Sequence, residues 1–577
     1  MKVRLNQVLS SVAIASSLLL SASPLVMPAS SALAASDTKS YAITNITQAQ
    51  IKSVLQEKTA TGWRIGSVFQ LTNTSGSIVR IPDFELRAKA ADGTVFTLQP
   101  SSSNAKSISP QSSVDLSYMV EADVKADIQL TDLLWVDVDL AVYPKKETVL
   151  ADAPVSGLVW KGGDAVIADT ALKNWGDAFT LPLLHSSLTY SAVSMTTQYD
   201  GQSPVYVLQI KAENPGGYTE TVPDFTISAK TATQAFIGKR LETAAVSLNP
   251  GEQQYIHIAI KTDPGTQPSA FYVLTPQTFA KAGQAQPLTY YTGEVGFHLP
   301  AAGAVAEALP AYTLGSPITF DSISKAVSPQ LTSSLLGIEW FENEGQSYKT
   351  AIAKLKYTNS SESPVPVPQL GADLVSANGV TFNGGITSTA VKDVLPGVGS
   401  VVTYAFAVPN DEVDTQQFTL RLLEQQDQAG FKSPIAQLPV GVAAAAQPET
   451  NDLLLYPYEV KMSSWSLSMF VNSNATTQGY NYTFRLKTDL DITTTDQVIT
   501  DPNNPKLLIE IIDDNGVRQG SKSLALTGDG RIVSGTQTIN FTNLSVDQLQ
   551  SHLTLKIYET QTTPLGDAKR LLTVLKQ

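Results

Sequence analysis

The sequence predicts an all-β chain of tandem antiparallel β-sandwich domains, because it carries an internal repeat, alternating strand patterns and no strong helical stripe. The repeat is an asparagine followed nine residues later by a proline, and it occurs as Asn73 and Pro82, Asn214 and Pro223, and Asn359 and Pro368. Successive copies lie 141 and 145 residues apart, which is the size of a small domain and too long for a solenoid unit.

Strand patterns surround each copy of the repeat. Apolar and polar residues alternate before the asparagine at 67–72, 205–210 and 351–357, and again after the proline at 84–88, 225–229 and 370–375. Further strands are expected at 114–118, 254–258 and 401–406, and closing strands at 134–138, 271–274 and 418–422. Such alternation is typical of half-buried strands. The dipeptides Asp92-Gly93, Asn378-Gly379 and Asn515-Gly516 predict two-residue hairpins with positive φ.

These patterns divide the chain into four sandwiches and their connections. The predicted boundaries are a cleaved signal peptide at 1–34, sandwich 1 at 41–150, a linker with extra strands at 151–187, sandwich 2 at 188–290, a second linker with extra strands at 291–330, sandwich 3 at 331–436, a linker at 437–451 and a divergent sandwich 4 at 452–577. The linkers are assigned from their Pro, Gly and Ala content.

The N-terminus has the pattern of an export signal. Lys2 and Arg4 precede an apolar run at 12–20, and small residues at 32–34 predict cleavage after Ala34. No later segment has about 18 consecutive apolar residues, so we expect no membrane span after cleavage. The predicted localisation is therefore secreted or cell-envelope associated.

Composition narrows the compartment and the partners. The 577-residue chain has a formal net charge of −13, which argues against nucleic acid and anionic lipid as partners. It has no cysteine, which excludes disulfides, thiolate metal sites and a cysteine nucleophile. A secreted multidomain β-protein without disulfides fits a Gram-positive bacterium.

The repeated asparagine and proline are expected to have structural roles. Asparagine at a strand end can adopt the left-handed conformation and bond the backbone two residues on. Proline donates no ladder hydrogen bond, so it suits the first residue of an edge strand. The alternative is that the Asn and Asp side chains of the motif bind a ligand.

The motif resembles a known family. Strand, Asn, loop, Pro-x-Asp/Phe, strand, Asp-Gly, strand, Pro-Gly and strand, ending in Val408-Pro409 in the third copy, looks like the immunoglobulin-like domain-of-unknown-function family of Gram-positive secreted and cell-envelope proteins. The similarity is best over 60–142, 195–275 and 345–425. The second copy has Thr233-Gln234 in place of Asp-Gly, and the third has Gln369-Leu370 in place of Asp-Phe. The resemblance implies an immunoglobulin-like fold, an accessory role outside the cell and no catalytic residues.

Chemistry-bearing side chains are sparse. The four histidines are not within metal-ligand spacing of one another, no Gly-x-Ser-x-Gly motif occurs, and we predict neither a cofactor nor enzymatic activity. An acidic insertion in the last domain is a candidate calcium site, with Asp489, Asp491, Asp496 and Asp501 as ligands.

Four tryptophans beside polar or small residues are candidate glycan contacts, because aromatic faces stack on sugars: Trp63, Trp160, Trp175 and Trp465. Core packing is the commoner use of such side chains. We expect Trp135 and Trp340 to be core residues.

The expected function is that of a non-enzymatic, extracellular or cell-envelope binding or spacer module. Its partner would be a cell-envelope polymer or an extracellular protein. One alternative is an accessory or inhibitory subunit of a secreted enzyme or a surface-layer assembly, and another is a glycan-binding protein.

Overall fold

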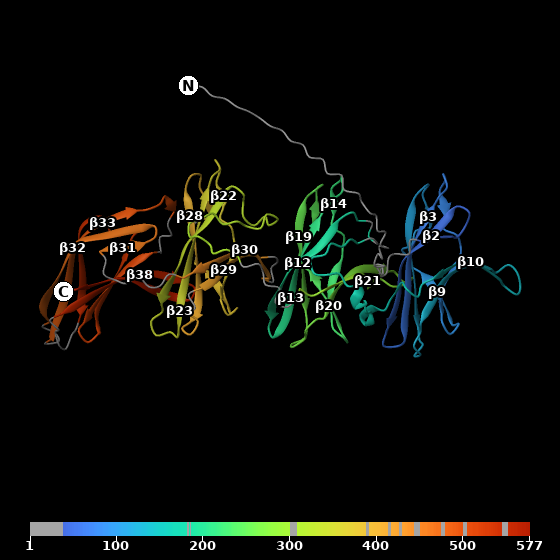
Figure 1. Cartoon of the computed structure of the whole chain (residues 1–577), viewed down its shortest axis with the longest axis horizontal. Helices are drawn as coiled ribbons and strands as arrows, with labels where there is room; N and C mark the ends of the chain where they lie inside the picture. Colours follow the sequence, from blue (N-terminus) through green and yellow to red (C-terminus); the bar gives the residue numbers. More distant parts are fainter. Residues whose placement is uncertain are drawn as a thin grey trace, which may run out of the picture.

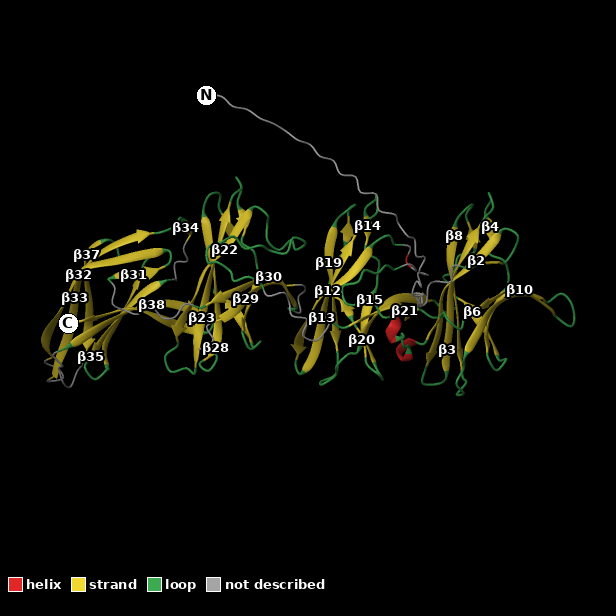
Figure 2. Ribbon diagram, viewed as in Figure 1, coloured by secondary structure: helices red, strands yellow, loops and turns green. Residues whose placement is uncertain are grey.

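The computed structural model describes residues 39–181, 184, 186–300, 309–387, 392–413, 417–425, 430–442, 451–474, 479–499, 505–544 and 552–577. The predicted signal peptide lies outside these residues. Figure 1 shows four β-units that follow one another in a row in chain order. Within the described residues the regular structure is β-strand and two short 3₁₀ turns, without an α-helix (Figure 2). This part of the chain holds no helix of the length and hydropathy that crossing a membrane requires.

Unit 1 contains ten strands, of which eight form two sheets joined through β6 and two, β4 and β7, form a small separate sheet. The strands are β1 (Ser40–Ala42), β2 (Thr47–Lys58), β3 (Trp63–Asn73), β4 (Val79–Arg80), β5 (Glu85–Ala90), β6 (Val95–Pro100), β7 (Ser107–Ile108), β8 (Ser113–Ala122), β9 (Leu130–Asp139) and β10 (Lys146–Pro154). The connection to unit 2 holds β11 (Val159–Trp160) and the turns η1 (Gly162–Asp164) and η2 (Asp169–Ala171).

Unit 2 has a similar arrangement, except that two strands, β16 and β17, take the place of β6 and its two main sheets are separate. Its strands are β12 (Thr189–Asp200), β13 (Ser203–Glu213), β14 (Glu220–Thr221), β15 (Thr226–Lys230), β16 (Ala235–Ile237), β17 (Lys239–Arg240), β18 (Ser247–Leu248), β19 (Gln253–Lys261), β20 (Ala270–Phe279) and β21 (Leu288–His298).

Unit 3 has the same strand order. Its strands are β22 (Leu331–Glu342), β23 (Tyr348–Asn359), β24 (Val365–Pro366), β25 (Gly371–Ser376), β26 (Thr381–Ile386), β27 (Asp393–Val394), β28 (Gly399–Pro409), β29 (Gln417–Gln425) and β30 (Lys432–Gly441).

Unit 4 lacks the small two-stranded sheet that units 1 to 3 share. Its strands are β31 (Asp452–Leu455), β32 (Tyr458–Asn474), β33 (Gly479–Thr494), β34 (Val498–Ile499), β35 (Lys506–Asp513), β36 (Arg518–Ala525), β37 (Gly535–Leu544), β38 (Leu553–Thr563) and β39 (Gly566–Lys576).

Units 1 to 3 share one topology. Their first sheet runs β2-β3-β8-β6, β12-β13-β19-β17 and β22-β23-β28-β26 in turn, whereas the first sheet of unit 4 runs β31-β32-β33-β37, in chain order. The second sheet has one order in all four units: β6-β5-β9-β10, β16-β15-β20-β21, β26-β25-β29-β30 and β36-β35-β38-β39. Between the named strands of the described residues, pairing is antiparallel except for two short parallel contacts, β2 with β11 and β28 with β34. The predicted all-β, antiparallel class is therefore confirmed.

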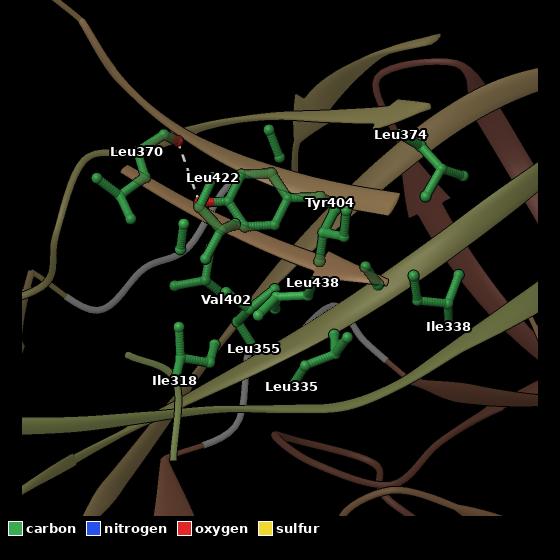
Figure 3. Close-up of a cluster of buried hydrophobic side chains, with 14 of the residues drawn as sticks. Ile318, Leu335, Ile338, Leu355, Leu370, Leu374, Val402, Tyr404, Leu422 and Leu438 are labelled. Carbon is green, nitrogen blue, oxygen red and sulfur yellow. Dashed lines mark hydrogen bonds between the residues drawn. The ribbon is translucent and has the colours of Figure 1, made fainter. Parts of the chain in front are cut away.

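Each pair of sheets encloses its own apolar cluster. In unit 3, strands from both sheets contribute Leu355, Val402 and Leu422, and the buried Tyr404 hydroxyl donates to the Leu370 carbonyl at 3.1 Å (Figure 3). The predicted core residues Trp135 and Trp340 are both buried. Alternation along the strands places these side chains on the face that meets the other sheet.

Three predicted boundaries fall inside strands. Residues 150, 290 and 436 lie within β10, β21 and β30, so the last strand of each unit extends into the segment assigned as linker. These strands lie at sheet edges, where one side of the ladder is free and proline is tolerated. The 151–187 segment does contain a further strand, β11, whereas the described part of 291–330 has no named strand after the end of β21.

The hairpin turns also differ from the prediction. Gly93, Gly379 and Gly516 have φ of +87°, +83° and +80°, but the residue before each glycine does not have positive φ. A type I′ turn needs positive φ at both central residues. The Ala90 N–H instead donates to the Thr94 carbonyl and the Gly93 N–H to the Ala90 carbonyl, so only the glycine needs the left-handed region.

Candidate functional site

The repeated asparagines form the same buried bonding pattern in units 1, 2 and 3, which we call the asparagine lock. Asn73 Nδ2 donates to the carbonyls of Ser77 at 2.7 Å, Ile108 at 3.3 Å and Ser109 at 3.1 Å, and its Oδ1 accepts from the Ser75 N–H at 2.8 Å. Asn214 bonds Tyr218, Leu248 and Gly216 in the same way, and Asn359 bonds Ser363, Val394 and Ser361. Each lock holds the loop after the asparagine against the two-stranded sheet β4–β7, β14–β18 or β24–β27.

The backbone at these asparagines is not left-handed. Among the described residues the only non-glycine residue with positive φ is Gln111. The expected bond to the N–H two residues on is present in all three copies. This bond forms at the end of a regular strand. Because the donor and acceptor atoms of the amide are both used inside the protein, the lock leaves little hydrogen-bonding capacity for a ligand.

The repeated prolines precede a central strand and do not begin an edge strand. Pro82, Pro223 and Pro368 each lie three residues before the strand that follows, β5, β15 or β25. Each of those strands has a neighbour on both sides. The prolines therefore stand outside the ladder, where a missing N–H costs nothing.

The four candidate tryptophans have different surroundings. Trp63 is only 9% exposed, and its Nε1 donates to the Ala126 carbonyl at 2.9 Å, so its ring is not available as a glycan platform. Trp175 packs against Phe271 and Phe297, and Trp465 packs against the unit 4 core. Trp160 alone of the four lines one of the pockets described here.

The acidic insertion does not assemble into a metal site in the described part of the chain. No group of three or more His, Asp or Glu side chains there could hold a metal ion. Asp496 instead forms an ion pair with Lys356 and accepts from the Tyr456 hydroxyl at 2.8 Å. Asp491 lies opposite Lys461 in the ladder, and Asp489 lies opposite Ser464. Asp501 lies outside the described residues.

A pocket of about 340 Å³ opens where units 1 and 2 meet, and we call it the tryptophan pocket. Its walls come from three parts of the chain: Glu57 and Arg64 of unit 1, Trp160 and Gly163 of the connection, and Lys230, Tyr272 and Tyr291 of unit 2. Trp160 and Tyr272 meet edge to face with ring centroids 6.1 Å apart. Aromatic walls with a few polar groups at a junction of domains are typical of small-molecule sites.

Glycines allow the elements around this pocket to pack closely. A Cβ at Gly293 on β21 would come within 2.5 Å of the Trp160 ring, and one at Gly296 within 2.6 Å of Leu172. Gly162 has φ of +61°, and a Cβ there would meet Glu57 at 2.8 Å. The indole therefore packs directly on the backbone of β21, which fixes its position relative to unit 2.

The charges of the tryptophan pocket are unequally paired. Arg64 Nη1 lies 2.8 Å from Glu57, and Nη2 lies 3.1 Å from Glu121. Lys230 is 5% exposed, and its Nζ donates to the Gly163 carbonyl at 2.5 Å. Burial lowers the pKa of Lys230, and the through-space attraction of Asp164 opposes this only in part. Among the described residues no carboxylate lies within ion-pair distance of the Lys230 ammonium.

The contact between units 3 and 4 combines the pairing of β22 with β39, a small apolar cluster of Phe341, Ile352 and Ala568, and a set of charged side chains. We call Glu339, Lys354, Glu559 and Arg570 the buried charge cluster. Lys354 Nζ lies 2.9 Å from Glu559 Oε1 and 3.1 Å from Glu339 Oε2. Arg570 Nε donates to Glu559 Oε2 at 3.0 Å, and its Nη2 lies 3.4 Å from Glu339. Burial disfavours ionised Glu559, but Lys354 and Arg570 outweigh that effect and lower its pKa.

A charged groove of about 480 Å³ lies beside this cluster. Glu510 accepts from Arg518 at 3.1 Å and from Lys569 at 3.3 Å, and both cations also contact Glu344 of unit 3. Since each of these cations already has two carboxylate partners, the groove is best described as part of the contact between the units.

Units 2 and 3 meet through hydrogen bonds and an apolar contact. The Tyr255 hydroxyl donates to Asp321 at 2.6 Å, and Gln198 Nε2 donates to the Lys432 carbonyl at 2.9 Å. Phe431 packs against the cluster that contains Val205 and Leu241. Nearby, His257 of β19 pairs with Glu242 at 2.9 Å, as a buried strand side chain.

Sequence reasoning did not find Lys230, the buried charge cluster or the 2–3 contact. Lys354 and Glu559 are 205 residues apart in the chain, and neither residue is in a motif. Lys230 ends an apolar strand and resembles an ordinary exposed terminus in the sequence. The available signal was Gly293 and Gly296 within an aromatic strand, which indicates close packing of another element.

Comparisons with known proteins do not identify a family for this chain. No family model matches the chain, and no curated protein matches it. Among solved structures, a DUF4785 family protein from Legionella pneumophila subsp. pneumophila str. Philadelphia 1 matches with 11% identity and a TM-score of 0.15, covering 67% of this chain and 89% of that one. Dimeric latent PorU from Porphyromonas gingivalis matches with 12% identity and a TM-score of 0.14, covering 68% of this chain and 33% of that one.

Proposed function

We propose that the protein is an exported, non-enzymatic chain of four immunoglobulin-like sandwich domains that acts as a stiff spacer and binding module outside the cell or in the envelope of a Gram-positive bacterium. The observation that carries the proposal is that each junction between consecutive units has its own side-chain contacts and is not bridged by a linker alone. Leu55 and Met119 of unit 1 pack with Phe279 and Tyr290 of unit 2.

The polar contacts at the junctions support stiffness in the same way. The Ser102 N–H donates to the Ala280 carbonyl at 2.8 Å between units 1 and 2. Tyr255 and Asp321 join units 2 and 3, and the buried charge cluster joins units 3 and 4. Contacts of this kind restrict the hinge motion that is otherwise expected between domains. A spacer holds its ends at a fixed distance only if such motion is small.

Small-angle X-ray scattering from the chain without its predicted signal peptide tests the spacer. We expect one elongated particle whose scattering curve matches that calculated from the row of four units in Figure 1. A curve that requires an ensemble of bent shapes would contradict the proposal. Cell fractionation tests the location: protein found in the washed envelope or in the medium supports export, and protein retained in the cytoplasm contradicts it.

A further inference from the structure

We propose that the tryptophan pocket binds a single acidic sugar residue, with the sugar ring against the aromatic wall and its carboxylate against Lys230. This inference rests on the binding half of the proposed function and names its ligand class. The pocket volume of about 340 Å³ lies near the lower end of the range of about 300–1,000 Å³ for small-molecule sites. That size suits one ring better than a long oligosaccharide.

The aromatic wall is the reason why we expect the ligand to contain a sugar ring. Trp160 and Tyr291 are partly exposed and line the pocket together with the buried Tyr272. Tyr272 is held in place because its hydroxyl accepts from the Ile167 N–H at 3.0 Å. Trp160 is fixed by its contact with the backbone of Gly293. Rigid aromatic faces of this kind offer apolar contact area to the C–H face of a sugar at little entropic cost.

Lys230 is the reason why we expect the ligand to carry a negative charge. A buried ammonium is costly unless it is paired, and Lys230 has a carbonyl as its hydrogen-bond partner. An ammonium has three donors, so this bond leaves two for other partners. Arg64 differs, because Glu57 and Glu121 already compensate it. An anion in the pocket would therefore be attracted to Lys230 and would find in Glu57 an acceptor for a sugar hydroxyl.

Titration calorimetry with matched methyl glycosides tests the proposal on the chain without its predicted signal peptide. The probes are the methyl β-glycosides of glucuronic and galacturonic acid, and the neutral ligands are the same glycosides of glucose and galactose. We expect an acidic glycoside to bind about tenfold or more tightly than its neutral match, since a hydrogen bond to a charged group has about that effect.

Two substitutions separate the charge from the ring. Lys230→Met keeps most of the side-chain packing, and we expect it to weaken the acidic glycoside about tenfold to a hundredfold and to leave the neutral one unchanged. Tyr291→Ala should weaken both. Lys239→Met, on the exposed strand β17, is the matched control and should change neither. Thermal melting of each variant shows whether unit 2 has remained folded.

Each contrary outcome rejects a defined part of the inference. Equal binding of acidic and neutral glycosides, both indifferent to Lys230→Met, overturns the assignment of the carboxylate. Binding of acetate as tight as that of the acidic glycoside overturns the role of the ring. No binding of either acidic glycoside overturns the proposal as a whole. None of these results bears on the scattering experiment, so the spacer and the sugar site are tested separately.

Discussion

The junction between units 1 and 2 and the junction between units 3 and 4 join neighbouring units by different means. At the first, Trp160 and its neighbours fill the space with apolar and aromatic surface and leave a pocket. At the second, the paired charges of Lys354, Glu559 and their partners are added to the pairing of β22 with β39 and to a small apolar cluster. Apolar contact is non-directional and tolerates small shifts, whereas a buried ion pair is favourable only in a well-defined geometry. The difference indicates that the first junction leaves room for a ligand between its packed surfaces, whereas the second fixes the orientation of its units through the geometry of its ion pairs.

The largest expected effect comes from breaking the buried charge cluster. Glu559→Gln should weaken the contact between units 3 and 4 by about 3–5 kcal/mol, because Lys354 and Arg570 remain buried with less compensation. Urea denaturation and hydrogen exchange in β23 and β38 measure the loss. Glu362→Gln, on an exposed loop, is the control.

The cluster also permits a sharper version of that test. Replacing the pair together, Lys354→Met with Glu559→Leu, should restore much of the lost stability, because two well-packed apolar side chains need no compensation. If Glu559→Gln were as harmless as Glu362→Gln, the ionic description of this junction would be wrong.

The asparagine locks provide a comparison within the units. We expect Asn73→Ala and Asn359→Ala to cost about 2–3 kcal/mol each, because buried backbone groups lose their partners. Chemical denaturation measures both, with the exposed Asn410→Ala as reference. Similar costs would show that units 1 and 3 are held together internally in the same way and differ at their junctions. A much larger cost for one lock would refute that view.

The apolar junction should respond more weakly. Trp160 is half-buried, so we expect Trp160→Ala to lower the free energy of unfolding by about 2 kcal/mol. Removing a fully buried aromatic ring costs more, about 3–5 kcal/mol. Scattering should show bending between units 1 and 2, while Trp160→Phe retains the elongated shape. A straight particle for Trp160→Ala would mean that Leu55, Met119 and Phe279 hold the junction without the indole.

The smallest expected effect is the change of stability with pH. At alkaline pH this change has opposite signs at the two junctions. Glu559 has a pKa lowered from its ordinary 4.5, so its stabilisation is present above that value and is lost as pH falls through the folded pKa. Lys354 has a pKa raised from 10.5, because its carboxylate partners outweigh burial, so its contribution is lost as pH rises through the folded pKa. The 3–4 junction should thus weaken at both extremes.

The contribution of Lys230 to stability changes with pH in the opposite direction to that of Lys354. Burial lowers its pKa below 10.5, so the unfolded chain binds more protons as the pH approaches that value, and the stability of the 1–2 junction should rise with pH there. Limited proteolysis between pH 8 and 11 measures both junctions in one sample. Cleavage that increases equally in the two connecting regions would count against the assigned directions.

Local patterns predicted much of the fold. Alternation and the repeated Asn and Pro located the strands β3, β5, β13, β15, β23 and β25, because apolar residues recur along each of them at the spacing of a strand. The last strand of each unit was not assigned, because β10, β21 and β30 contain Pro154, Gly293 and Pro434, residues that indicate a linker in sequence but are tolerated at a sheet edge. No local pattern indicates that the prolines precede central strands.

The candidate site was predicted only in part. Trp160 was among four possible tryptophans, and nothing local distinguishes it from Trp63, whose indole nitrogen has a buried partner 63 residues away. Its neighbours Arg64 and Lys230 are brought to it by the packing of two units, which depends on contacts between residues distant in the chain. The charge cluster has the same origin, and a single sequence does not encode such pairs in any periodic pattern.

The distance in sequence between Lys354 and Glu559 divides the buried charge cluster between two separately encoded halves. Lys354 lies 3.1 Å from Glu339 of its own unit, whereas its second partner, Glu559, follows 205 residues later in the chain. A chain that ended before β38 would therefore keep the pair of Lys354 with Glu339 but would lack Glu559 and Arg570. In such a truncated chain this ion pair would face water on the surface of unit 3, where the whole protein covers it.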